Sequence, residues 1–418
     1  MIMNPLTNHT KIRHPQSART TLHFKVLPCN KNINQISWFH KILVGYFHCS
    51  LTVRADIGLS FPAIAQRIIS DYFKPSKLVI DREVSLIDMR SVLFALRDCL
   101  RDLTISQIGI GEPTWPSATP TIDISHLASL KVDRVDFSFL KELLAYVSMD
   151  NLRTLDLRVE SLESMPHELN IRWSRLKDLT LHDDFSLEVL NTLMGSLCDV
   201  TRLKWSGKLT RVNHKKYSYN LESLKDLSVF SNEDGCAFFL RNIRSKTLQT
   251  LHLSHFSLGN HRHGLLGVRN LFIEENIDSN QFLAILNHFP TLFSADFRIG
   301  STSVTEKSEL FMQQKFARLK SLILRNVSAP IRPLLMSIPL SRLKFLEMTF
   351  DLKADNKHQF CLGLADCLQT EDGVPLETLR LVDANLTREG WRACLEIVGP
   401  TLVDYQIRRT RLEGDRQL

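Results

Sequence analysis

A hexapeptide of the form L-x-x-L-x-L recurs along most of this chain of 418 residues. A clear example is LQTLHL at residues 248–253, and thirteen such hexapeptides share one register. Successive copies start 20 to 33 residues apart, and four consecutive intervals are 24 residues. A regular period of this size indicates a solenoid, in which each repeat packs on its neighbours. The copies start at residues 100, 127, 152, 176, 200, 224, 248, 268, 292, 319, 343, 376 and 402.

Each repeat is predicted to form a short strand, a turn and a helix, because apolar residues between the hexapeptides recur at helical spacing. Strands joined through such crossovers run parallel. The predicted fold class is therefore α/β, a solenoid with a parallel sheet on its concave face and helices on its convex face. Residues 50–53 and 77–80 are predicted to be degenerate strands of the same kind. Helical spacing is clearest in Phe137, Leu140, Leu143 and Leu144, in Leu187, Leu190, Met194 and Leu197, and in Phe282, Leu283, Leu286 and Phe289.

The same pattern divides the chain into three parts. Residues 1–20 are polar and aperiodic and are predicted to be a disordered tail. Residues 21–99 are predicted to hold degenerate repeats or a cap, and residues 100–418 the thirteen clear repeats. Insertions in repeat proteins lie in loops that often bind ligands. Surface loops that have lengthened without acquiring a function would explain the longer connections equally well. The longer connections are 112–120, 207–220, 300–308 and 351–375, and the second of them is basic and aromatic.

Composition narrows the classes of partner and compartment. The chain has 52 Lys and Arg against 45 Asp and Glu, and its densest basic clusters lie in predicted connections, which disfavours a nucleic-acid partner. No apolar run reaches the roughly 20 residues of a membrane span, and the first residues lack the apolar segment of a signal peptide. The eight cysteines form no C-x-x-C pair, which favours buried thiols and a cytoplasmic or nuclear location.

Catalytic and cofactor motifs are missing from the sequence. It contains no G-x-G-x-x-G after a strand, no G-x-x-x-x-G-K-[ST], no H-E-x-x-H and no G-x-S-x-G. His261 and His263 have no carboxylate or cysteine nearby in sequence, so a solvated loop is favoured over a metal site. We therefore expect no enzymatic activity, no catalytic residues, no cofactor and no metal.

The pattern resembles the leucine-rich repeat family, clearly from Leu100 to Leu412 and weakly from Ser50 to Leu100. The best single match is residues 376–391, which resemble the ribonuclease-inhibitor-like type with its asparagine displaced to Asn385. The resemblance implies an asparagine ladder at the turn after each strand. Because other residues occupy that position in several repeats, we expect an irregular horseshoe. These residues are Glu160, Asp184, Phe256, Val327 and Ala384.

Irregular repeats of this kind also resemble those behind the F-box in substrate adaptors of cullin-type ubiquitin ligases. An F-box would open with Leu-Pro and an acidic residue. Leu27 and Pro28 are present, but residues 29–33 lack the acidic position, so no clear F-box is found. The resemblance therefore reaches the repeats alone, and it implies a substrate receptor with a cullin-ligase adaptor subunit among its partners.

The third, fifth and seventh positions of each hexapeptide unit are predicted to face the concave surface, because strand side chains alternate. Large apolar residues occur there only from the sixth clear repeat onward, and arginines accompany them. Aromatics beside arginines are typical of protein interfaces. The predicted partner-binding residues are Phe230, His252, Phe272, Arg298, Arg325, Phe345 and Arg380.

The sequence thus favours a non-enzymatic protein that binds a protein partner on its concave face. A substrate receptor of a cullin-type ligase is the more specific hypothesis. The alternatives are a scaffold or inhibitor without a ubiquitin link, and an arc whose arginines bind RNA or another acidic ligand.

Overall fold

A computed structural model describes the repeats of this protein. The described residues are 50–54, 76–81, 86–106, 121–160, 169–210, 217–256, 265, 267–301, 318–327, 342–350, 376–382, 386–387, 392, 395–396, 399–408 and 412–413. The predicted tail at 1–20, the loops at 112–120 and 351–375, and the position sought for an F-box lie outside them. The chain forms two compact units, Met1–Asn151 and Leu152–Leu418.

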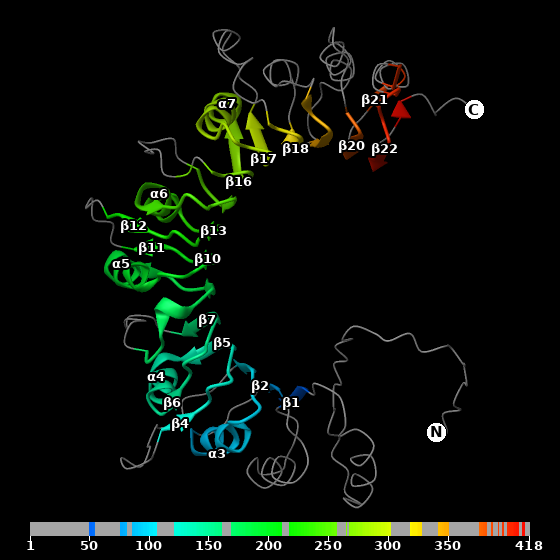
Figure 1. Cartoon of the computed structure of the whole chain (residues 1–418). Coiled ribbons are helices and arrows are strands. Elements are labelled where there is room, and N and C mark those ends of the chain that lie inside the picture. Colours follow the sequence, from blue (N-terminus) through cyan, green and yellow to red (C-terminus); the bar gives the residue numbers. More distant parts are fainter. Residues whose placement is uncertain are drawn as a thin grey trace, which may run out of the picture. The chain divides into compact units, whose positions relative to one another are not determined.

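Every one of the thirteen hexapeptides forms a strand that begins at its third residue. The prediction of an α/β fold with a long parallel sheet is confirmed within each unit (Figure 1). In the first unit the parallel strands are β1 (Ser50–Arg54), β2 (Lys77–Asp81), β3 (Asp102–Ser106) and β5 (Ser129–Asp136). In the second unit they are β7 (Thr154–Glu160), β8 (Asp178–Leu181), β10 (Arg202–Ser206), β13 (Asp226–Phe230), β15 (Thr250–Leu253), β16 (Asn270–Asp278), β17 (Ser294–Ser301), β18 (Ser321–Val327), β19 (Phe345–Phe350), β20 (Thr378–Val382) and β22 (Asp404–Arg408).

Equivalent positions of the hexapeptides lie side by side in the sheet. Leu203 of β10 pairs with Leu179 of β8 and with Leu227 of β13, and all three leucines are at the fourth position. Their side chains are at most 2% exposed. Because strand side chains alternate, the fourth and sixth positions build the core, and the third, fifth and seventh positions share the other face.

Helices pack behind the sheet where the apolar spacing predicted them. The predicted helical sets form α4 (Phe137–Ala145), α5 (Leu187–Ser196) and α7 (Ser279–His288), and the structure adds α3 (Leu86–Leu96) and α6 (Glu233–Asn242). The carboxylate of Asp278 accepts a hydrogen bond from the backbone N–H of Gln281 at 2.7 Å. In turn, the side-chain oxygen of Gln281 accepts a hydrogen bond from the backbone N–H of Asp278. This capping box satisfies two backbone donors and begins α7 where the sequence requires it.

The prediction of a helix in every repeat is not met by the described residues of two connections in the second unit. The connection from β7 to β8 contains the 3₁₀ helix Trp173–Arg175. The described residues between β10 and β13 contain only the short strands β11 (Leu209–Thr210) and β12 (Tyr219–Asn220). Two-residue parallel pairs recur behind the main sheets, and nothing in the sequence pattern predicted them. The other members are β4 (Ile122–Asp123) with β6 (Val147–Ser148), β9 (Phe185–Ser186) with β11, β12 with β14 (Ile243–Arg244), and β21 (Leu386–Thr387) with β23 (Leu412–Glu413).

The aromatic residues of the 207–220 connection pack inward. Tyr219 is buried, its ring stacks on Tyr217 at 6.2 Å, and both rings contact Phe238 of α6. The hydroxyl of Tyr219 donates a hydrogen bond to the Asn191 side chain of α5. The described part of this connection is therefore a piece of the core that joins two helices, and its aromatic character reflects packing.

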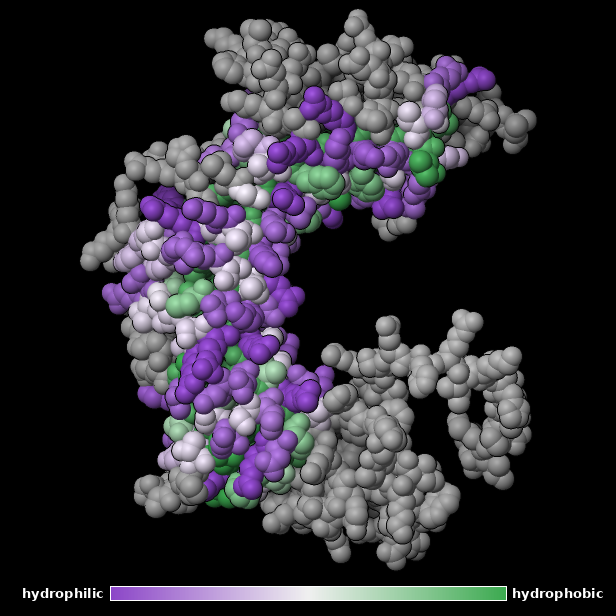
Figure 2. Space-filling model, in the orientation of Figure 1, coloured by the Kyte–Doolittle hydropathy of each residue, from purple (hydrophilic) through white to green (hydrophobic). Residues whose placement is uncertain are grey.

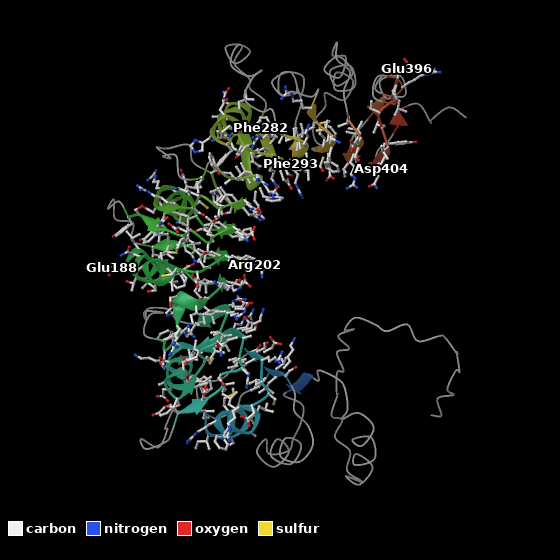
Figure 3. The ribbon with its side chains drawn as sticks, viewed as in Figure 1. Glu188, Arg202, Phe282, Phe293, Glu396 and Asp404 are labelled. Atoms are coloured by element: carbon white, nitrogen blue, oxygen red, sulfur yellow. The ribbon has the colours of Figure 1, made fainter. Side chains whose placement is uncertain are left out.

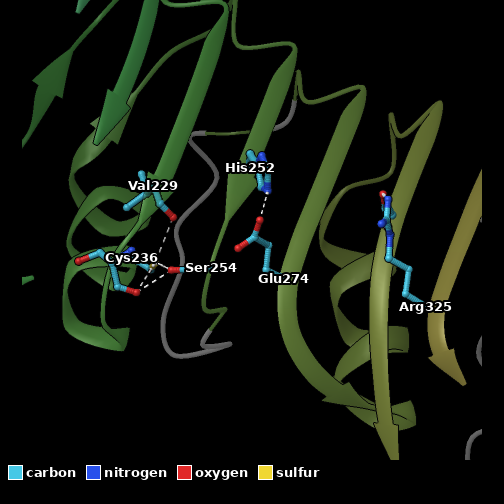
Figure 4. Close-up of polar contacts among 8 residues, drawn as sticks. Val229, Cys236, His252, Ser254, Glu274 and Arg325 are labelled. Carbon is cyan, nitrogen blue, oxygen red and sulfur yellow. Dashed lines mark hydrogen bonds and ion pairs between the residues drawn. The ribbon is translucent and has the colours of Figure 1, made fainter. Parts of the chain in front are cut away.

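The described cysteines correct part of the thiol prediction. Cys236 is buried behind β13 and β15, where its sulfur lies 3.6 Å from Ser254 Oγ (Figure 4). Burial raises the pKa of this thiol. Cys198, by contrast, is exposed, and Cys99 is half-buried. Only one of these three free thiols is therefore the buried structural thiol that the sequence suggested.

Different side chains form hydrogen bonds with the backbone in the turns that follow several strands. Asn232 accepts the backbone N–H of Leu209 at 3.1 Å, donates to the Leu209 carbonyl at 3.3 Å and caps α6 at the Gly235 N–H. Asp184 accepts the Lys208 N–H at 2.7 Å, and Glu275 accepts the Phe256 N–H at 2.9 Å. Asn232 stands at the ninth position of its repeat, as does Asn276. An asparagine therefore stands at the ninth position in two repeats that were not predicted to have one, whereas Asp184 occupies that position in the repeat that starts at residue 176.

Asp183, in the turn after β8, makes the stability of the protein dependent on pH. Its carboxylate accepts the Val159 N–H at 2.9 Å, but burial raises its pKa to about 6 from an ordinary value near 3.8. Between these values the folded chain holds a proton that the unfolded chain has released, so stability falls as pH rises from about 4 to about 6. Because the group is only partly buried, we discount the shift to about 1 kcal/mol.

We therefore expect Asp183→Asn to raise the free energy of unfolding by about 1 kcal/mol at pH 7.5 and to leave it unchanged at pH 4, because the amide oxygen still accepts the Val159 N–H. Urea unfolding at the two pH values measures the effect. Asp184→Asn, at the exposed neighbour, is the control. An equal gain at both pH values would show that the charge of Asp183 is not the cause.

Candidate protein-binding face

The second unit has one sheet face that its helices leave uncovered. Figure 1 shows α5, α6 and α7 on one side of the strands, and in Figure 3 Arg202 of β10 and Glu188 of α5 lie on opposite sides. We call the surface formed by the third, fifth and seventh hexapeptide positions of β7 to β22 the open face. Figure 2 shows hydrophilic residues over most of the visible surface, with hydrophobic ones among them.

Three of the predicted binding residues form a continuous aromatic row on the open face. His252 of β15 pairs in register with Phe272 of β16, and their ring centroids lie 5.5 Å apart. Phe230 of β13 meets the other side of the His252 ring at 4.6 Å in an edge-to-face arrangement. All three rings are partly exposed, and Lys204 Nζ lies 5.3 Å from the Phe230 centroid. The row is thus a partly exposed aromatic surface with a cation at one end.

A carboxylate orients the central ring of this row. Glu274 of β16 lies with Oε1 3.2 Å from His252 Nε2, as Figure 4 shows. Phe272 and Glu274 are the fifth and seventh positions of one strand, so both point to the same face. The imidazole is therefore held between two phenyl rings and an acid, which reduces the side-chain entropy that a partner would otherwise have to remove.

Arg325 has a partner within the protein. Its guanidinium donates two hydrogen bonds to Asp296 of β17, from Nε at 2.8 Å and from Nη2 at 2.6 Å. The Asp296 side chain is 11% exposed, whereas the Arg325 side chain is 53% exposed. The bond to Asp296 raises the pKa of Arg325, and the charges of Glu347 and Glu274 act in the same direction. Arg325 therefore first compensates a buried carboxylate and can contact a partner only with its remaining surface.

Arg298 and Arg380 differ from each other in whether they have an acidic partner within the protein. Arg298 pairs in register with Arg325, is exposed, and makes no ion pair with another described residue. Arg380 of β20 lies with its guanidinium carbon 5.2 Å from the Phe345 centroid, and its Nη1 is 3.7 Å from Glu347. Phe345 and Arg380 thus form a second cluster, and among the described residues Arg298 is the predicted arginine without an ion pair.

The other end of the open face is polar and internally paired. His182 Nε2 lies 3.0 Å from Asp156 Oδ1, and Arg202 donates two hydrogen bonds to Asp178, from Nε at 2.5 Å and from Nη2 at 2.6 Å. The described residues on β7, β8 and β10 bring no Phe, Leu or Ile to this face. Apolar contact area is therefore concentrated on β13 to β20.

The acidic partners of these basic residues were not predicted as site residues. Their positions on the face follow from the hexapeptide pattern, but their partners depend on the register between strands. The strands β16 and β17 shift register between Ile273 and Asn276, and this shift places Asn276, rather than Glu274, opposite Arg298. A bulge of this kind has no reliable sequence signal. The missed residues are Lys204, Glu274, Asp296, Glu347 and Asp404.

Comparisons with family models and with curated proteins found no match to this chain. In the part of the chain that the structure describes, no helix is long and apolar enough to cross a membrane. The same part holds no cluster of three His, Cys, Asp or Glu residues that could bind a metal ion.

Proposed function

We propose that this protein is a non-enzymatic leucine-rich-repeat solenoid whose open face binds a protein partner over β13 to β20. The observation that carries the proposal is the aromatic row of Phe230, His252 and Phe272, half-exposed and preorganised by Glu274. Aromatic residues held rigid at the centre of a surface are the usual anchors of protein interfaces. Arg298 adds one exposed cation beside the row.

The charges of the open face favour a protein partner over a polyanion. His252 with Glu274, Arg325 with Asp296, and Arg380 with Glu347 and Asp404 place an acid beside nearly every base on these strands. A phosphate backbone would meet several carboxylates here, whereas a partner with mixed polar and apolar side chains would not. The RNA-binding alternative is therefore not favoured for this face.

Removing the anchors is expected to weaken capture of the partner by about 30-fold or more, since one good anchor contributes about 2 kcal/mol. The partner is first identified by affinity purification with mass spectrometry, and its affinity is then measured by calorimetry. The site variant replaces Phe230, Phe272, Arg298 and Phe345 with alanine. It omits Arg325, because losing Arg325 would leave Asp296 buried and unpaired.

A matched variant on the polar end of the same face is the control. It replaces Thr154, Arg158, Thr180 and Ser206, which occupy third, fifth and seventh positions of β7, β8 and β10. Both variants must keep the wild-type circular dichroism. If the control loses the partner and the site variant keeps it, the binding face is not β13 to β20. The recovery of a cullin-ligase adaptor subunit in the same purification would support the more specific role as a substrate receptor, and its absence would favour a scaffold or inhibitor.

A further inference from the structure

One edge of the sheet in the second unit is strongly basic. We consider the residues immediately before and after the first apolar residue of each hexapeptide, which precede the strands. In the described part of the second unit these positions hold nine cations and two anions, a net charge of +7, which is the net charge of the entire chain. The cations are Arg153, Arg175, Lys177, Lys225, Arg269, Arg318, Lys320, Arg342 and Lys344, and the anions are Asp199 and Glu377.

Backbone hydrogen bonds align these residues in space. The N–H of Arg269 donates to the Gln249 carbonyl at 2.8 Å, the Phe293 N–H to the Arg269 carbonyl at 2.7 Å, and the Lys320 N–H to the Phe293 carbonyl at 2.9 Å. The same bond recurs at the second hexapeptide position from Arg153 to Val403. Neighbouring residues of this row are therefore about 4.8 Å apart, although 20 or more residues separate them in sequence. We call Lys225, Arg269, Phe293 and Lys320 the edge row.

The cations of the edge row lack the compensation that the open face has. The two anions at this edge are already engaged, since Asp199 lies 3.1 Å from Lys177 Nζ and Glu377 pairs with Lys344. Lys225, Arg269 and Lys320 form no ion pair with any other described residue, and Lys225 and Arg269 are exposed. A row of unpaired like charges has an unfavourable self-energy that an extended anion would relieve.

An exposed aromatic ring stands within this row. Phe293 (labelled in Figure 3) is 52% exposed and lies between Arg269 and Lys320. The equivalent position in the other repeats of the second unit holds Lys, Arg, Gln, Thr, Glu or Val. A ring among cations is the arrangement with which proteins hold single-stranded nucleic acid, because cations contact the phosphates and a base stacks on the ring. A duplex offers no free base face for this contact.

We propose that the edge row binds single-stranded nucleic acid. The phosphodiester backbone contacts Lys225, Arg269 and Lys320, and one base stacks on Phe293. In the sequence the densest basic clusters lie in the connections, and this disfavoured a nucleic-acid partner. The parallel register, however, assembles a row of cations from separate repeats. This site is distinct from the open face and does not depend on the function proposed for it.

Salt dependence tests the phosphate contacts. Anisotropy of a labelled single-stranded RNA of about 15 nucleotides is measured between roughly 50 and 200 mM salt. Each lost phosphate contact lowers the slope of log K against log salt by about 0.7 for a single strand, so alanine at Lys225, Arg269 and Lys320 should lower it by about 2. The control removes three cations outside the edge, Lys208, Arg241 and Arg392, and should lower the slope by less than 1.

Phe293→Ala tests the stacking contact. It should weaken RNA binding at least 5-fold and leave the salt slope unchanged, because the ring carries no charge. A single-stranded DNA of the same sequence should bind comparably, and a duplex should bind less tightly. Absence of RNA binding by the wild type at the lowest salt would overturn the proposal. So would a Phe293→Ala variant that binds like the wild type, or polyglutamate that binds as tightly as RNA, since either outcome indicates an acidic polypeptide. The open-face variant with four alanines should bind RNA normally.

Discussion

Leu251→Asp is expected to unfold the second unit or to lower its free energy of unfolding by at least about 4 kcal/mol. Leu251 is at the fourth position of its hexapeptide, is fully buried, and lies between Leu227 and Leu271 in the register of β13, β15 and β16. The substitution removes a packed side chain and places a charge between the two leucines. Both terms act in the same direction.

Gln249→Asp is the matched control, because it introduces the same charge two residues earlier at an exposed position. It should change the free energy of unfolding by less than about 0.5 kcal/mol. Urea unfolding followed by circular dichroism measures both variants. Similar midpoints for the two would mean that the fourth position does not point into the core, and the assignment of the open face would fall with it.

Gly207→Ala and Gly195→Ala are expected to change stability in opposite directions. A Cβ at Gly207 would lie 2.0 Å from the carbonyl oxygen of Asp183 and 2.5 Å from its carbonyl carbon, so backbone atoms of two repeats would have to move apart. The cost should be about 3 kcal/mol. Gly195 lies in α5 with no atom within 4 Å of an added Cβ, and alanine there should stabilise the helix by up to about 1 kcal/mol.

Thermal unfolding of both glycine variants measures the difference. The Gly207 N–H also donates to the Phe230 carbonyl at 3.0 Å, so a distortion there reaches the end of β13 and the first ring of the aromatic row. We therefore expect Gly207→Ala to weaken partner binding as well. A Gly207→Ala variant as stable as the wild type would show that the turns after β8 and β10 do not pack against each other as closely as the structure has them.

The repeat pattern alone predicts a large part of this molecule. The hexapeptides predict the strands and their parallel direction, and the alternation within each strand separates Leu179 or Leu251 in the core from Asp178 or His252 on the open face. These features are local, since they depend on residues within one repeat and on a period that is the same everywhere. The apolar spacing predicts α4, α5 and α7 for the same reason.

The side-chain contacts between different repeats, by contrast, were decided only by the tertiary structure. Arg325 bonds Asp296, and the side chain of Asn232 accepts the backbone N–H of Leu209. Both bonds form only because the register brings together residues that are 23 or more positions apart in the sequence. Tyr219 belongs to a connection that the sequence marks as basic and aromatic, but it is buried because its hydroxyl contacts α5 and its ring contacts α6. Tyr217 stacks on it and is half-buried. The intervals between successive hexapeptides vary between 20 and 33 residues, so differences in turns and bulges decide which side chains meet.

The register between strands also explains why the open face and the edge row differ in charge. In the sequence, Lys225, Arg269 and Lys320 are isolated cations within apolar strand motifs, and Phe293 is one more aromatic residue. The backbone bonds between equivalent positions turn them into a row, whereas the acids beside the arginines neutralise much of the open face. Electrostatic energy depends on the distance between charges in space, and the sequence specifies that distance only through the completed sheet.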